Sequence, residues 1–160
     1  MSLSLKKEKM IEYLQDAKKH DENFECMLWG TIYADNLSFK NRSAMSKGMV
    51  FTAAPGVSGS LNQAFCYIGM TEKSFYAIAL DAYDTSKIIG TFYIPYTSIS
   101  SLHVQKAILT NTHRVMIDFG DIVTLTVKGI SLGTDINDQK ERMADFLAAA
   151  RVLQSSLPLP

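Results

Sequence analysis

The sequence predicts a mainly β fold, in which about seven antiparallel strands form two packed sheets and a helix lies at each end of the chain. Three observations support this prediction. Short apolar runs rich in Phe, Tyr and Ile recur between polar turn residues, as strands do. Gly120-Asp121 separates two such runs and indicates a tight hairpin turn. After the last run, apolar residues spaced three and four apart predict a helix that can cover the open end of a barrel.

Length and composition limit the class of protein. The chain has 160 residues, which fits one domain, and its 16 basic and 16 acidic residues leave no net charge. A general nucleic-acid binder needs a basic excess, so we expect no nucleic-acid partner. We see neither a secretory leader nor an apolar run of about 20 residues that would span a membrane. We therefore expect a cytoplasmic protein, either free or attached to the inner face of the membrane.

Residues 1–20 predict an N-terminal amphipathic helix. Met10 and Leu14 fall close to one apolar stripe, and most of the lysines lie outside it. These lysines are either a solvated surface or a means of attraction to anionic lipid, which a Lys-rich amphipathic helix can supply. Glu8 and Glu12 dilute the positive charge of that face.

Seven ranges have the pattern of strands: 24–33, 61–71, 74–80, 88–94, 99–105, 114–119 and 122–128. Range 74–80 is apolar on both faces, so both should be covered. Range 122–128 alternates, so one face should be buried and the other solvated. In range 88–94 we expect one face to hold Ile88, Gly90, Phe92 and Ile94, and the other Ile89, Thr91 and Tyr93. The second face is either covered by the N-terminal helix or exposed as an interface.

Residues 34–60 predict a long excursion with one short strand in it. Lys40, Arg42 and Lys47 form a basic patch in this excursion. The patch is either a weak site for an anion or anionic lipid, held by charge-assisted hydrogen bonds, or part of a solvated loop.

The C-terminal region predicts a helix and a tail. Asp138 and Glu141 have the spacing of a capping box, with Asp138 as the cap, and the helix should end near Gln154. Residues 155–160 are expected to be a disordered tail after a single domain over residues 24–154. The apolar face of the helix should cover the barrel, and it consists of Met143, Phe146, Leu147, Ala150 and Leu153.

Seven strands followed by one helix is the order of the pleckstrin-homology (PH) superfold. Residues 68–75 (IGMTEKSF) resemble the turn of bacterial PH-like domains with the pattern G-hydrophobic-T-x-x-R/K-hydrophobic, although Ser74 stands where many relatives have Arg. Residues 94–99 (IPYTSI) are similar to the I-P-Y-x-x-I segment of the same family. The resemblance covers roughly residues 25–154 and implies a PH-like barrel with a C-terminal capping helix. The N-terminal helix is an addition to that pattern.

The resemblance also implies a role in interaction. Bacterial members look like assembly modules, and some form rings of identical subunits. Eukaryotic relatives bind phosphoinositide head groups through basic residues in the loop between their first two strands, which is comparable to the loop that holds Lys40, Arg42 and Lys47. The spacing of these three residues does not reproduce a phosphoinositide pattern.

No group of residues in the sequence matches a catalytic, cofactor or metal pattern. The three histidines are far apart, and neither His-x-x-x-His nor Cys-x-x-Cys occurs. Cys26 and Cys66 lie inside apolar runs and are expected to be buried, reduced thiols. We therefore expect no catalytic residue, no cofactor and no metal.

The sequence thus predicts a non-catalytic PH-like module that self-associates and binds another, unidentified protein. Trp29, Tyr93 and Tyr96 are candidate interface residues because aromatic side chains are favoured at subunit contacts, and Trp29 is otherwise a core anchor. Two alternatives stay open. The first is a peripheral binder of anionic lipid that uses the basic loop and the N-terminal helix. The second is a small enzyme, or a carrier of an apolar ligand inside the barrel.

Overall fold

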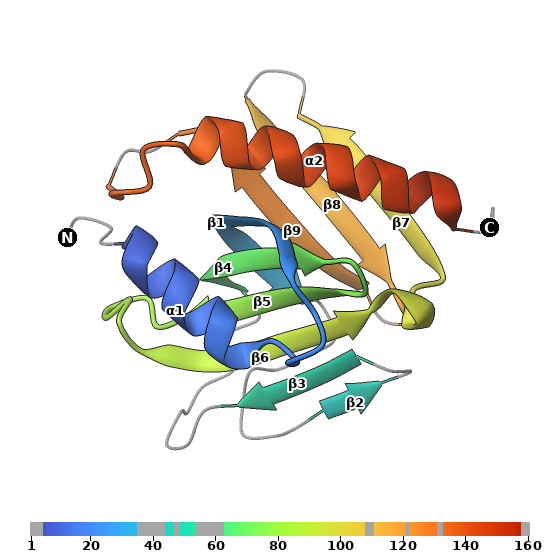
Figure 1. The fold of residues 1–160 in the computed structure, drawn as a ribbon, viewed down its shortest axis with the longest axis horizontal. Helices are drawn as coiled ribbons and strands as arrows, with labels where there is room; N and C mark the ends of the chain where they lie inside the picture. Colours follow the sequence, from blue (N-terminus) through green and yellow to red (C-terminus); the bar gives the residue numbers. More distant parts are fainter. Residues whose placement is uncertain are drawn as a thin grey trace.

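The computed structural model describes residues 5–34, 44–46, 49–53, 63–107, 111–120, 122–130 and 133–157 (Figure 1). All seven predicted strands are present, and the mainly β fold class, with antiparallel strands and a C-terminal helix, is confirmed. The excursion that was expected to hold one short strand contains two, β2 and β3. The elements in order are α1 (Lys7–Ala17), β1 (Phe24–Ala34), β2 (Ala44–Ser46), β3 (Met49–Ala53), β4 (Gln63–Thr71), β5 (Ser74–Leu80), β6 (Ile88–Pro95), the short 3-10 helix η1 (Tyr96–Ser98), β7 (Ser101–Lys106), β8 (Thr112–Asp118), β9 (Ile122–Lys128) and α2 (Gln139–Ser156).

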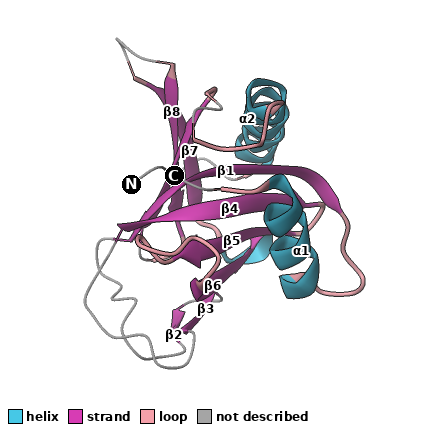
Figure 2. Ribbon diagram, turned by 90° about the vertical axis from the view of Figure 1, so that its left-hand side faces the viewer, coloured by secondary structure: helices cyan, strands magenta, loops and turns pink. Residues whose placement is uncertain are grey.

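The nine strands of the described residues form one antiparallel sheet, in the order β2-β3-β6-β5-β4-β1-β9-β8-β7. β1 pairs with β4 along almost its whole length, but it pairs with β9 only from Thr31 to Ala34. Figure 2 shows that the two halves of the sheet, which meet at β1, run in clearly different directions. The two packed sheets that the sequence predicts are these halves, joined by β1 into one hydrogen-bonded sheet.

Gly30 lies where β1 begins to pair with β9. A Cβ atom at this position would be 2.5 Å from the carbonyl oxygen of Thr126 on β9, which is closer than side-chain carbons come to backbone. The absence of a side chain therefore lets the two strands approach each other at the junction of the two halves.

The main core lies between the two halves of the sheet, and α2 covers its open side (Figure 1). α2 contacts β1, β7 and β9. The ring of Phe146 on α2 lies 6.4 Å from that of Phe75 on β5, so the helix reaches the strands of the far half. Four of the five predicted apolar residues of α2 are buried and Leu153 is partly buried, which confirms that this face packs on the sheet.

A second core lies on the other face of β1, β4 and β5, under α1. The hydroxyl oxygen of Tyr67 accepts a hydrogen bond from the Lys6 N–H (3.1 Å), and that of Tyr76 accepts one from the Lys19 N–H (3.1 Å). These bonds hold both ends of α1, so the helix packs as part of the same folded unit. The residues of this second core are Leu5, Met10, Leu14, Trp29, Tyr67, Tyr76, Ile78, Leu80 and Ile136.

The predicted assignment of faces on β6 is wrong at the first two residues of the strand. The pairing with β5 shifts by one residue between Ile88 and Gly90, so that Ile89 is the extra residue of a β-bulge. As a result, Ile89 packs in the main core with Phe92, whereas Ile88 lies on the α1 side with Tyr93. Ile88 and Tyr93 both pack against the core that lies under α1, and Tyr93 stays half-buried there.

Candidate functional site

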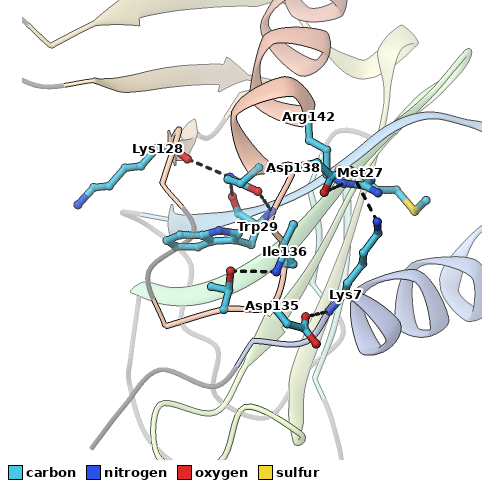
Figure 3. Close-up of polar contacts among 10 residues, drawn as sticks. Lys7, Met27, Trp29, Lys128, Asp135, Ile136, Asp138 and Arg142 are labelled. Carbon is cyan, nitrogen blue, oxygen red and sulfur yellow. Dashed lines mark hydrogen bonds and ion pairs between the residues drawn. The ribbon is translucent and has the colours of Figure 1, made fainter.

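The N-terminal half of β1 has a strand neighbour on one side only, and α2 lies along the other side. Gln139, the first residue of α2, accepts a hydrogen bond from the Trp29 N–H (3.3 Å) and donates to the carbonyl oxygens of Trp29 (2.9 Å) and Lys128 (3.0 Å). Arg142, one turn later, donates from Nη1 to the Met27 carbonyl oxygen (3.1 Å; Figure 3). Side chains of α2 thus bond both backbone groups of Trp29 and the carbonyl of Met27 on the edge that a further strand would otherwise pair with.

Arg142 also forms an ion pair that sets the start of α2. Its Nε donates to the Asp138 carboxylate (2.8 Å), and this bond lowers the pKa of Asp138. Lys7 Nζ approaches the same carboxylate at 3.7 Å, and the Lys7 N–H donates to Asp135 Oδ1 (2.5 Å; Figure 3). The predicted capping box is wrong, because Asp138 occupies the N-cap position but its side chain caps no backbone N–H of the helix.

A charged cleft of about 270 Å³ lies between the N-terminal end of β1 and the first half of α2. Glu25, Glu141 and Asp145 are exposed in it, and none of the three forms an ion pair with another described residue. The cleft therefore carries unneutralised negative charge. Its lining residues are Phe24, Glu25, Cys26, Met27, Asp138, Glu141, Arg142 and Asp145.

A second, largely apolar cleft of about 390 Å³ lies beside the second half of α2. Met70 and Thr71 at the end of β4 are buried and line its inner side, whereas Val152 on α2 is 71% exposed. Glu25 lines both clefts, so they adjoin at that residue. The residues of the apolar cleft are Glu25, Met70, Thr71, Glu72, Tyr96, Thr97, Ala149, Val152, Leu153, Ser156 and Leu157.

Hydrogen bonds fix the floor of the apolar cleft. The Tyr96 hydroxyl donates to the Thr71 carbonyl oxygen (2.5 Å), and the Thr71 hydroxyl donates to the buried carboxylate of Glu22 (2.6 Å). The Ser74 N–H donates to the same Thr71 hydroxyl oxygen (3.0 Å). Burial raises the pKa of Tyr96, so its phenol stays a neutral donor in this network. A cleft with such a floor is formed before any ligand enters it.

We call the two adjoining clefts the α2 groove. The face of α2 that lines it changes in character along the helix, at positions spaced three and four apart. Its first half is charged and its second half is mostly apolar. The helix residues of the groove are Asp138, Glu141, Arg142 and Asp145, followed by Ala149, Val152, Leu153 and Ser156.

The structure places the predicted site residues in three different settings. Trp29 is 5% exposed and packs in the core beneath α1. Tyr93 is half-buried, 5.3 Å from the Tyr76 ring and under the Lys19 ammonium at 4.7 Å. Tyr96 lines the α2 groove. The basic patch of Lys40, Arg42 and Lys47 lies outside the described residues.

The sequence analysis did not identify Glu25, Glu141, Asp145 and Val152 as site residues. For the residues of α2, the sequence did contain a signal. Glu141 and Asp145, followed by Val152, recur at helical spacing on a face other than the core face. Glu25 had no such signal, because it joins the group only through the packing of β1 beside α2.

The thiols are poorly suited to nucleophilic chemistry. Cys26 and Cys66 are buried and free, as predicted. Burial raises the pKa of Cys26 to about 12 and also raises that of Cys66, whereas a reactive thiol needs a lowered pKa. Within the described ranges, no three His, Cys, Asp or Glu side chains are grouped so as to hold a metal ion. None of the helices in the described part of the chain is both long and apolar enough to cross a membrane.

No family profile and no curated protein matches the chain. The hSac2 domain from human phosphoinositide phosphatase Sac2 is similar in fold, with a TM-score of 0.50 and 8% identity over 94% of this chain and 84% of the other. The Vps36 N-terminal PH domain matches with a TM-score of 0.38 and 13% identity over 80% of this chain and 91% of the other. These similarities concern the fold alone. The similarity to the hSac2 domain extends over nearly the whole chain and so includes both the strands and the C-terminal helix.

Proposed function

We propose that the chain is a non-catalytic, cytoplasmic interaction module that binds a segment of another protein in the α2 groove. The observation that carries this proposal is the apolar cleft of about 390 Å³, which adjoins the charged cleft at Glu25. Val152 and Leu157 offer apolar surface there, and a bound protein segment would remove that surface from water. At protein interfaces a few side chains seated in pockets carry most of the binding energy.

Two observations support a binding role over catalysis or transport of an apolar ligand. The pKa of each thiol is raised, which opposes a nucleophilic role. The space between the two halves of the sheet is filled by large buried side chains that pack on one another, among them Phe75, Phe92 and Phe146. Buried, unpaired cysteines also agree with a reducing compartment such as the cytoplasm.

Self-association is part of the same proposal. β7 stands at the end of the strand order and pairs only with β8 among the described strands. An edge strand of this kind can pair with the same strand of a second copy. Light scattering at two protein concentrations tests this step: we expect a dimer or larger species at the higher concentration, and a monomer at both would contradict it.

The alternative of anionic-lipid binding has less support from α1. The Lys9 ammonium is 3.1 Å from the Glu12 carboxylate, and Lys7 lies near the Asp138 carboxylate. Lys19 lies over the ring of Tyr93. These contacts engage two lysines of α1, and a third that follows it, within the protein. Sedimentation with phosphatidylserine vesicles, using the wild-type chain and a variant with Lys40→Glu and Arg42→Glu, tests this alternative directly.

Selection from a random peptide library tests the main proposal. Ala149 lines the groove and its neighbour Ala148 is exposed elsewhere on α2, so Ala149→Arg should fill the groove whereas Ala148→Arg should not. We expect peptides that bind the wild-type chain and the Ala148→Arg variant but not the Ala149→Arg variant. Selected peptides that bind all three equally, or no selected peptide, would contradict the proposal.

A further inference from the structure

We propose that the α2 groove recognises an extended protein segment with a basic residue four or five positions away from a large aliphatic or aromatic residue. This inference rests on the proposed function and adds the chemistry of the partner to it. The basic residue lies in the charged cleft, and the apolar residue lies in the apolar cleft.

The negative charge of the groove is the reason why the partner segment should carry a basic residue. Glu25, Glu141 and Asp145 line the charged cleft without an ion-pair partner among the described residues. Arg142, the only cation among the residues that line the described cleft, is engaged by Asp138 and the Met27 carbonyl. Three like charges in one small cleft repel each other. A Lys or Arg side chain would neutralise this repulsion and form charge-assisted hydrogen bonds, whereas an acidic segment would be excluded.

The apolar cleft is the reason why the partner segment should carry a large apolar residue. Its volume of about 390 Å³ accommodates one or two large side chains, and it is lined by apolar atoms of Met70, Tyr96 and Leu153. Hydrogen bonds within the protein already fix the hydroxyl of Tyr96 and both the carbonyl oxygen and the hydroxyl of Thr71, so these polar groups need not be rearranged on binding. Transfer of a Leu or Phe side chain into such a cleft is favourable in proportion to the apolar area buried.

The geometry of α2 sets the spacing between the two residues. Asp145 and Leu153 are eight residues apart, which at about 1.5 Å per residue along a helix is about 12 Å. Glu141 and Val152 are eleven residues apart, or about 17 Å. An extended chain advances about 3.3 Å per residue, so it covers these distances in about four to five residues. The two anchors of the partner should therefore be that far apart.

The partner segment is extended and belongs to another protein. The Met27 carbonyl faces α2, so the alternation along an antiparallel strand directs the Met27 N–H to the same side. This backbone lies beside the charged cleft, where an extended segment can reach it.

A set of synthetic peptides tests the inference. Each peptide has a Ser/Gly background with one Arg and one Leu, and the separation between them runs from one to eight positions. Binding to the ¹⁵N-labelled full chain is followed by shifts of the backbone amides of Glu25, Thr71 and Asp145. We expect the tightest binding at a separation of four or five. Replacing the Leu by Ala should weaken binding at least about tenfold.

Matched variants of the protein test whether the carboxylates of the charged cleft contribute to peptide binding. Asp145→Asn and Glu25→Gln should each weaken binding about two- to fivefold, and the effect should shrink at high salt, whereas Asp16→Asn on α1 should have no effect. If peptides without Arg bind as tightly as peptides with Arg, this inference is overturned while the proposed function still stands. Groove shifts that grow with protein concentration alone would show a second copy as the occupant, and shifts caused only by vesicles would show a lipid. Either result would overturn the inference.

Discussion

Replacement of Gln139 by Leu is expected to lower the free energy of unfolding strongly, although the two side chains have similar volumes. Gln139 is 0% exposed, and its amide makes three hydrogen bonds, to the Trp29 N–H, the Trp29 carbonyl and the Lys128 carbonyl. A Leu side chain has a similar volume but leaves these groups unpaired, and each buried unpaired group costs about 1–3 kcal/mol. Because the bond to the Trp29 N–H is long and Lys128 is near water, we expect a total loss of about 2–4 kcal/mol in the free energy of unfolding.

Urea unfolding measures this loss, with the fluorescence of the only tryptophan, Trp29, and circular dichroism as probes. For a chain of this size, a loss of about 3 kcal/mol shifts the urea midpoint by about 1.5 M. Gln154→Leu is the matched control, since Gln154 lies on the same helix and is exposed. If Gln139→Leu lowers the midpoint no more than Gln154→Leu does, the inference that Gln139 satisfies the edge of β1 is wrong.

Three further predictions concern packing and burial. Gly30→Ala should lower the free energy of unfolding in urea by about 1–3 kcal/mol, because its Cβ would meet the Thr126 carbonyl oxygen at 2.5 Å; an unchanged midpoint would contradict this close approach. Burial raises the pKa of Tyr76 to about 12. The unfolded chain therefore loses this proton first, and stability should fall between about pH 10 and 12. Urea midpoints should fall less steeply there in Tyr76→Phe, and an equal fall would refute this cause. A chromogenic disulfide reagent should modify Cys26 and Cys66 quickly only in the unfolded chain, and fast reaction of the folded chain would show that they are accessible.

The sequence predicts best those strands whose burial follows from periodicity alone. β5 and β9 begin and end at the predicted residues. All of β5 is buried, as a strand that is apolar on both faces requires, and Val123, Leu125 and Val127 of β9 are buried between less buried residues. The core face of α2 was predicted for the same reason, because helical spacing identifies it without knowledge of its neighbours.

The failures occur where a distant partner overrides local preference. The bulge at Ile89 shifts one end of β6 by a residue, and an apolar pair such as Ile88-Ile89 carries no sign of which residue is extra. The cap at Asp138 fails because Arg142, together with the Met27 carbonyl, holds the side chains in another arrangement. The bond from Arg142 to the Met27 carbonyl oxygen spans 115 residues, so it cannot be derived from the spacing of residues along the chain.

The α2 groove depends on a feature that the sequence does not show. β9 stops pairing with β1 before Gly30, and this leaves the space beside Glu25 and Met27 that α2 enters. A pattern of residues predicts a strand but does not predict how many residues of it each neighbour will pair with. Tyr96, which was predicted as an interface residue on aromatic character alone, lies in this groove because η1 follows β6 directly.

The central claim is that the α2 groove binds a basic and an apolar side chain of its partner. A double-mutant cycle that exchanges the charges of Asp145 and of the arginine in the best-binding peptide tests this claim most directly. Binding is measured for the wild-type chain and Asp145→Lys, each with the arginine peptide and with a peptide that carries Glu at that position. We predict that either single change weakens binding and that the two together restore it in part. If the doubly changed pair binds no better than the weaker single change, the carboxylate and the peptide cation do not meet, and the assignment of the groove is wrong.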